Sequence, residues 1–166
     1  MFSLYLNAQV VIEESFKVAG ETRTGYVATS AKYDRSRIDS AIAGKLAKGG
    51  LYHKGRTKGY QTFVGQSWSA TGPGIVTVNY KVTGKKGKVR IYFAVSKGLH
   101  NDVTAENDPK SARNIQFFLT TLDAGIAKDE QLAKEQAANP PVKQDTDSSK
   151  NIRPNQPQRF QKVVTY

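Results

Sequence analysis

Apolar and polar residues alternate in two pairs of neighbouring segments, the pattern of strands with one buried face. Residues 10–18 place four apolar side chains on one face, namely Val10, Ile12, Phe16 and Val18. Residues 22–31 follow after a short turn and are rich in Thr, Val and Tyr, which favour strands. Residues 76–82 and 89–95 alternate in the same way around the glycine-bearing turn 84–87. The pattern therefore predicts two β-hairpins.

Two other segments carry the three-and-four spacing of amphipathic helices. In the first, Asp34 stands at an N-cap position and Gly49-Gly50 provides a stop. Its apolar positions are Ile38, Ala41, Ile42 and Leu46. In the second, Asp108 caps a helix that begins at Pro109. Its broad apolar stripe, which needs a sheet to cover, comprises Ala112, Ile115, Phe118, Leu119, Leu122 and Ile126. We expect this helix to continue as a polar, exposed extension through Glu135.

A further strand is predicted over residues 60–68, which gives the order ββαβββα. Runs of strands with helices placed to one side indicate an α+β fold. We predict a single antiparallel sheet of about five strands, with two helices packed on one face. The chain of 166 residues has the length of one domain, which we assign to residues 10–138.

The composition changes after this domain. Residues 139–166 form a polar tail rich in Pro, Gln and Asn, and residues 143–159 contain a single aliphatic side chain. Such a segment does not bury enough apolar surface to order itself. We expect it to dock onto a neighbouring molecule through its few apolar residues, Ile152, Phe160, Val163, Val164 and Tyr166.

The first nine residues, MFSLYLNAQ, are open to two interpretations. They are the end of a signal peptide that starts upstream and is cleaved near Ala8, or they are a first strand. A complete signal has a basic start and a longer apolar stretch, which are missing here. The first interpretation places the protein in the periplasm or cell envelope, and the second in the cytoplasm or a virion. No apolar run has the length of about 20 residues that crosses a membrane, and the absence of cysteine excludes disulfides and thiolate zinc sites.

Three stretches of the sequence resemble small uncharacterised exported proteins of Bacteroidota: FKVAGETRTGYVAT, KGYQTFVG, and the hairpin IVTVNYKV…KVRIYFAVS before a final helix. Those proteins tend to begin with a signal peptide that ends in a tripeptide similar to Asn7-Ala8-Gln9, and some are assigned a TBP-like α+β fold. The resemblance covers residues 9–136 and depends on element order and turn placement. It implies an envelope location and supplies neither a function nor site residues.

The net charge of +11 is concentrated in the middle of the chain. Between Asp39 and Asp102 there are eleven Lys and Arg residues and no carboxylate, whereas the fourteen basic residues elsewhere balance fourteen acidic ones. A segment of one sign attracts polyanions at long range. We therefore expect residues 45–97 to contact an anionic partner. The candidate side chains lie in one loop and about the tip of the second hairpin, and they are Lys54, Arg56, Lys58, Lys81, Lys85, Lys86, Lys88, Arg90 and Tyr92.

Aromatic residues are interleaved with these cations, a combination that suits stacking on bases or sugars. Tyr92 lies on the polar face of its strand and is the best candidate for such a contact. Trp68 is expected in the core, and Tyr60 fits either role.

The sequence shows no catalytic constellation. The two histidines, His53 and His100, lack neighbours at metal-ligand spacing. The stretch GKKGK at residues 84–88 lies between two strands, so no helix N-terminus backs its amides for phosphate binding. We therefore predict no enzymatic activity, no metal and no cofactor.

Two classes of function remain. The first is a non-enzymatic binding or structural module in a cell-envelope assembly, which contacts an anionic macromolecule or acidic protein surface through residues 45–97 and docks by its tail. The alternative is a nucleic-acid-binding protein, or a virion or assembly subunit, that uses the same basic patch.

Overall fold

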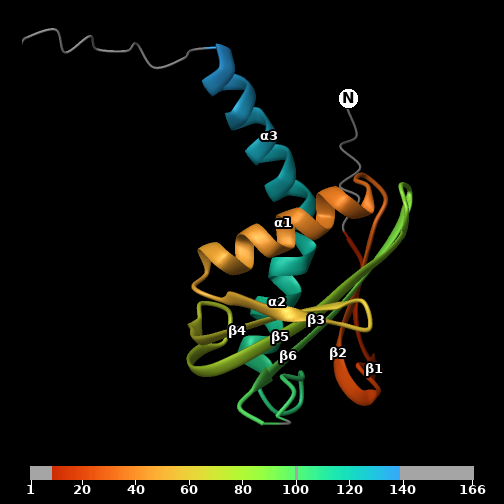
Figure 1. Cartoon of the computed structure of the whole chain (residues 1–166), viewed down its shortest axis with the longest axis vertical. Helices are drawn as coiled ribbons and strands as arrows, with labels where there is room; N and C mark the ends of the chain where they lie inside the picture. The colour runs from red at the N-terminus through yellow and green to blue at the C-terminus, as the bar shows by residue number, and fades with distance from the viewer. Residues whose placement is uncertain (1–8, 100, 139–166) are drawn as a thin grey trace, which may run out of the picture.

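The computed structural model describes residues 9–99 and 101–138, which form one six-stranded antiparallel sheet and three helices (Figure 1). The strand order is β1-β2-β6-β5-β4-β3, so β1 and β3 are the two edges. The strands are β1 (Val11–Val18), β2 (Glu21–Ser30), β3 (Tyr52–Thr57), β4 (Tyr60–Trp68), β5 (Gly72–Lys85) and β6 (Lys88–Lys97). The helices are α1 (Arg35–Lys48), α2 (Pro109–Thr120) and α3 (Leu122–Ala138). The predicted α+β class with a single antiparallel sheet is confirmed.

Two elements differ from the prediction. Residues 52–57 were expected to form a loop, and they form the edge strand β3. This strand is exposed almost throughout and carries an irregularity between His53 and Gly55, so it has no alternating pattern. The last helix was expected to be continuous, and it is divided at Thr121, whose backbone N–H and hydroxyl bond to carbonyls of the preceding turn. Leu122 and Ile126 of α3 are nevertheless buried, as the apolar stripe predicts.

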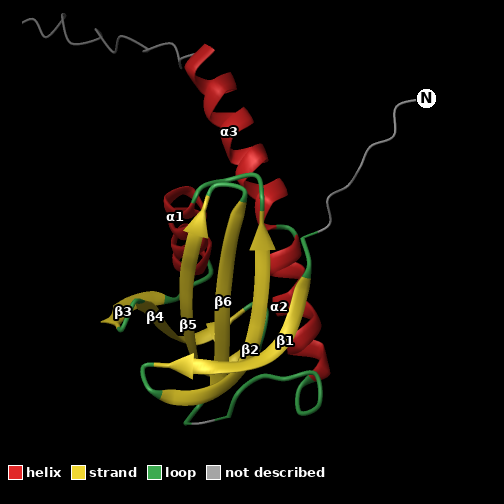
Figure 2. Ribbon diagram, turned by 90° about the vertical axis from the view of Figure 1, so that its right-hand side faces the viewer, coloured by secondary structure: helices red, strands yellow, loops and turns green. Residues whose placement is uncertain are grey.

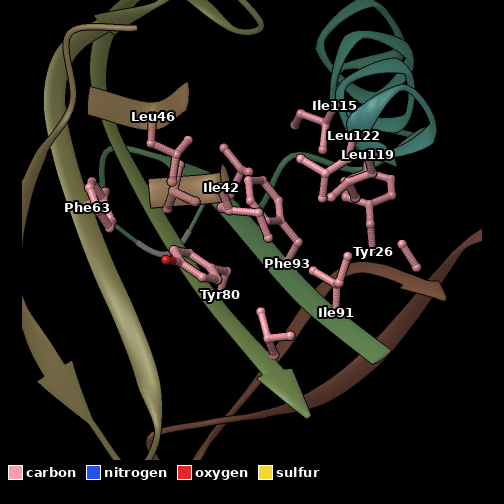
Figure 3. Close-up of a cluster of buried hydrophobic side chains, with 14 of the residues drawn as sticks. Tyr26, Ile42, Leu46, Phe63, Tyr80, Ile91, Phe93, Ile115, Leu119 and Leu122 are labelled. Carbon is pink, nitrogen blue, oxygen red and sulfur yellow. The ribbon is translucent and has the colours of Figure 1, made fainter. Parts of the chain in front are cut away.

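The main core lies between the sheet and the helices (Figure 3). Asp34 caps α1 by accepting a hydrogen bond of 2.9 Å from the Arg37 amide, and Asp108 caps α2 in the same way. From these caps each helix turns its apolar stripe toward the strands. The largest side chains that are fully enclosed here include Tyr26, Ile38, Ile42, Leu46, Tyr80, Ile91, Phe93, Ile115 and Leu119. The helices cover one face of the sheet and leave the other without helices; we call the second the outer face.

The β1–β2 hairpin does not lie flat beside the other strands, because it curls across the outer face (Figure 2). The Phe16 ring lies parallel to the Tyr60 ring of β4, with 6.4 Å between centroids, and meets the Tyr92 ring of β6 edge-on at 5.4 Å. Val18 and Ala94 complete a small second core. We call these five residues the outer-face cluster.

The curl corrects the predicted orientation of β1. Val11 pairs with Ala28 of the main core, so the alternate positions of β1 point to the outer face. Phe16 is consequently part of the outer-face cluster, while Val10 and Ile12 are exposed at 64% and 47%. The four residues that were expected to face the main core therefore do not contribute to it.

Two features place the β1–β2 hairpin across the outer face. Gly25 allows the close approach of the strands, and an ion pair holds the hairpin there. A Cβ on Gly25 would stand 2.6 Å from the Phe93 carbonyl oxygen and 3.0 Å from the Phe16 ring, so only glycine lets β2 pass this close. Beside it, Arg23 forms a two-pronged ion pair with Asp102, whose Oδ2 also accepts a 3.0 Å hydrogen bond from the Thr24 amide. Both side chains of the pair are about 15% exposed, at 14% and 16%. The pair therefore ties the turn end of the hairpin to the loop after β6.

We predict that Asp102→Asn lowers the free energy of unfolding by about 2 kcal/mol, because Arg23 remains largely buried without its partner charge. Urea denaturation measures this change. The matched control is Glu130→Gln, which removes the exposed ion pair between Arg37 and Glu130 and is expected to change stability by less than about 0.5 kcal/mol. Equal effects of the two substitutions would show that the Arg23 pair does not hold the hairpin.

Candidate anion-binding face

The outer face carries two cations that lie against aromatic rings. The ammonium nitrogen of Lys81 is 5.5 Å from the ring centroid of Tyr60, and the guanidinium carbon of Arg90 is 5.7 Å from that of Tyr92. Lys81 pairs with Tyr92 across β5 and β6, and Arg90 pairs with Thr83 two residues further along β5. Because paired residues share a face, both cations lie on the outer face in neighbouring rows.

The tip of the β5–β6 hairpin extends this group. Lys85 pairs with Lys88, and both are exposed and have the same alternation as Lys81 and Arg90. Lys86 lies in the turn itself and is exposed. On the other side of the tip, Lys85 and Lys86 border a hollow that also contains Asp34 and Asp39 of the α1 region. The tip therefore has two acidic neighbours on the helix side and continues the line of cations on the outer side.

The β3–β4 turn contributes one more cation to the outer face. Lys58 adopts a positive φ of 48° in this turn, and its ammonium lies 3.4 Å from the point where a Cβ on Gly20 would stand. Gly20 is at the end of the β1–β2 hairpin that crosses the outer face. The Lys81 side chain lies 3.2 Å from the corresponding point on the adjacent Gly59. Lys58 and Lys81 are thus neighbours.

Arg56 does not join them. It pairs with Gln61, and Gln61 pairs with Tyr80 of the main core, so Arg56 lies on the helix-covered side. Burial raises the pKa of Tyr80, and the charge of Arg56 opposes this rise. Lys54 is exposed beside the irregularity in β3. The expected single patch is therefore divided: we call Lys58, Lys81, Lys85, Lys88 and Arg90 the basic face, and Arg56 points away from it.

The cations of the basic face have no ion-pair partner within 4 Å in the part of the chain that the structure describes. Of the eleven cations between residues 40 and 101, Lys97 alone has such a partner there, at 2.6 Å from Asp108. Glu14, which pairs with Gly25, is a carboxylate on the outer face. The basic face therefore keeps most of its positive charge available to an external anion.

The aromatic residues near the basic face are mostly buried in the two cores and expose little ring surface for stacking. Tyr60 is 6% exposed, and its burial raises its pKa. One face of its ring lies toward Phe16, and the Lys81 ammonium is also close to the ring. Tyr92 is half-buried in the same cluster, and Trp68 is 3% exposed in the main core, as expected. The rings of Tyr60 and Tyr92, the two candidate stacking residues on this face, therefore leave little free surface on which a base or sugar could stack.

The groups singled out for possible chemistry are dispersed. His53 is exposed, and its Nε2 lies 2.9 Å from Oε1 of Gln61. Within residues 9–99 and 101–138, no three His, Asp or Glu side chains gather as metal ligands would, and no helix is long and apolar enough to cross a membrane. The predictions for His100, for residues 1–8 and for the apolar residues of the tail concern positions outside the described residues.

A cavity that the sequence did not indicate lies next to the basic face. It has a volume of about 470 Å³ and is bordered by the starts of β1 and α3 and by the adjoining ends of β2 and β6. Its polar residues are Gln9, Thr29, Ser30, Lys88, Arg90 and Asp123. Ser30 and Asp123 are 93 positions apart, so no local motif could have revealed their contact.

Comparison of the chain with family models, curated proteins and solved structures finds no match.

We predict that the ion pair of Lys97 gives the protein a specific acid sensitivity. The hydrogen bond from Lys97 lowers the pKa of Asp108 to about 2, and hydrogen bonds from Ser111 act in the same direction. A carboxyl whose pKa is lower in the folded state stabilises the protein above its unfolded pKa of about 4, and this contribution is lost as the pH falls toward 2.

The variant Asp108→Asn tests this, because asparagine keeps the N-cap and removes the charge. Urea denaturation of both proteins is expected to show a lower stability of the variant at about pH 6 and a shrinking difference between about pH 4 and pH 2. A difference that stays constant over this range would contradict the assignment.

Proposed function

We propose that the protein is a non-enzymatic binding module that holds an anionic macromolecule on its basic face. The observation that carries this proposal is the convergence of Lys58, Lys81 and Arg90 with the cationic tip of the β5–β6 hairpin on one side of the sheet. These side chains come from three different parts of the chain and have no acidic partner within 4 Å among residues 9–99 and 101–138.

The geometry suits a polymer better than a small anion. The cations follow β5 and β6 from the middle of the sheet to the hairpin tip, over rows that repeat at about 6.6 Å for every second residue. A polymer with regularly spaced charges is able to contact several of these rows at once. The field of such a face attracts it over a Debye length of about 8 Å at physiological salt.

The aromatic rings restrain the side chains of two of these cations before a ligand binds. Lys81 and Arg90 lie at cation–π distance from Tyr60 and Tyr92, whose positions are set by the outer-face cluster. A side chain that is already restrained loses less conformational entropy when it meets a ligand. The cluster therefore supports the basic face from below and does not need to contact the ligand.

The partner that we favour is an acidic protein, a polysaccharide or lipid headgroups in a cell envelope, with the tail at residues 139–166 as a second docking element. This location and the role of the tail follow from the sequence expectations alone. A nucleic acid is the second candidate, since its phosphates would meet the same cations. The limited free surface of Tyr60 and Tyr92 removes the base-stacking part of that hypothesis.

We predict that the double substitution Lys81→Gln with Arg90→Gln weakens binding to polyanions by about tenfold or more. The slope of log affinity against log salt concentration is expected to fall by the amount that corresponds to about two charges. Fluorescence anisotropy with labelled polyglutamate and with a homopolymeric single-stranded DNA of about 20 nucleotides measures this over a salt series.

The matched control is Lys110→Gln with Arg113→Gln, which removes the same charge from exposed positions on α2 and is expected to leave affinity nearly unchanged. Binding of both probes supports recognition by charge, and binding of DNA alone supports the nucleic-acid alternative. Equal losses in the two double variants, or no binding by the unmodified chain at low salt, would overturn the basic face as a binding site.

A further inference from the structure

Strand β3 leaves one side of its backbone open to a partner. It is an edge of the sheet, at the opposite end of the strand order from β1 (Figure 2). Among residues 9–99 and 101–138, β4 is its only strand partner, and no backbone hydrogen bond beyond that ladder involves residues 52–57. Every side chain of β3 is exposed, and Gly55 alone is half-buried. The amide and carbonyl groups that point away from β4 are therefore available to a further strand.

The charged side chains of this edge are all basic. Lys54 and Arg56 lie on β3, and neither has an ion-pair partner within 4 Å in the described part of the chain. If two copies paired through this edge, these cations would repel each other, and lysine on an edge strand commonly prevents such pairing. Opposite charges across a strand pair stabilise it by about 0.2–1 kcal/mol. The edge therefore favours an acidic strand over a second copy of itself.

The two faces of β3 differ, which sets a sequence pattern for the partner. Arg56 pairs with Gln61 and lies on the helix-covered side. Tyr52 pairs with Val64, three positions from Gln61 along β4, so it lies on the opposite side, where it is 63% exposed. An added strand has side chains on both faces. Acidic residues at alternate positions would meet Arg56, and β-branched residues between them would pack on the Tyr52 ring.

The irregular register of β3 favours a short ligand. The register shifts between His53 and Gly55, and such an irregularity increases the local twist, so that the long straight edge of another sheet does not follow it. The chain's own tail does not match the charge of this edge, because residues 139–166 contain five Lys and Arg residues and two Asp residues. The matching occupant is therefore a short acidic segment of another protein.

We propose that the free edge of β3 binds an extended acidic segment of a partner protein by strand addition. Backbone hydrogen bonds to residues 52–57 provide affinity, and the alternation of acidic with β-branched residues provides specificity. This site uses Lys54 and Arg56, the two predicted binding cations on β3 that are not part of the basic face. It does not depend on polyanion binding by that face.

The test titrates the ¹⁵N-labelled full chain with a capped hexapeptide, acetyl-Glu-Val-Glu-Val-Glu-Val-amide, and follows amide shifts by NMR. We expect saturable shifts and slower hydrogen exchange at residues 52–57, with a Kd of about 1 mM or tighter. The same peptide N-methylated at every residue keeps the charge and donates no backbone hydrogen bond. It is expected to bind about tenfold more weakly or not at all.

Two variants separate this site from the basic face. Arg56→Gln changes an exposed side chain and is expected to weaken hexapeptide binding about threefold. Lys81→Gln removes one charge from the basic face and is expected to leave hexapeptide binding unchanged.

Three results would overturn strand addition at β3. The first is equal binding of the hexapeptide and its N-methylated form, and the second is the absence of saturable shifts at residues 52–57. The third is self-association of the unliganded chain through β3, which would assign the edge to a second copy. Binding of polyglutamate and DNA to the basic face is measured separately, so these results leave that proposal intact.

Discussion

The crossing of the β1–β2 hairpin over the helix-free side of the sheet is the constraint on which the other features depend. It requires a residue without a side chain at Gly25, where β2 approaches both the β6 backbone and the Phe16 ring. It is held by Arg23 and Asp102, which join the turn end of the hairpin to the loop after β6. The Tyr26 hydroxyl adds a 3.0 Å hydrogen bond to the Val103 carbonyl in the same region. These contacts decide where the hairpin lies.

The crossing explains how one protein has a second apolar cluster and a basic surface on the same face. Phe16 and Val18 bury Tyr60 and Ala94, which an open sheet would expose to solvent. The rings in this cluster in turn lie beneath Lys81 and Arg90. The outer-face cluster therefore lies directly beneath two cations of the basic face, and we expect recognition to depend on charge more than on exposed aromatic rings.

The sequence correctly predicted the helices and hairpins that are determined by neighbouring residues. Asp34, Gly49 and Pro109 mark helix ends by capping chemistry, and α1 and α2 begin where these residues predict. The two hairpins followed from alternation around glycine-bearing turns. β3 was missed because an edge strand with exposed residues on both faces and an irregular register has no alternation to detect.

The errors in the predicted binding residues also arise because the deciding contacts are not visible in a short stretch of sequence. Arg56 was grouped with Lys58 because the two are close in a segment interpreted as a loop, and only the register of β3 against β4 shows that Arg56 lies on the helix-covered side. The orientation of β1 depends on its pairing with β2 and on the curl of the hairpin. The contact between Ser30 and Asp123 joins residues 93 positions apart, and the approach of the β1–β2 hairpin to β4 is equally non-local. Such features arise from tertiary packing and leave no short pattern in the sequence.

Nuclear Overhauser effects between aromatic ring protons test the hairpin crossing most directly. The account predicts cross-peaks from the Phe16 ring to the rings of Tyr60 and Tyr92, whose centroids lie 6.4 Å and 5.4 Å away. If Phe16 showed cross-peaks to β1 and β2 alone, the hairpin would extend away from the sheet. The support assigned to Lys81 and Arg90 would then be contradicted.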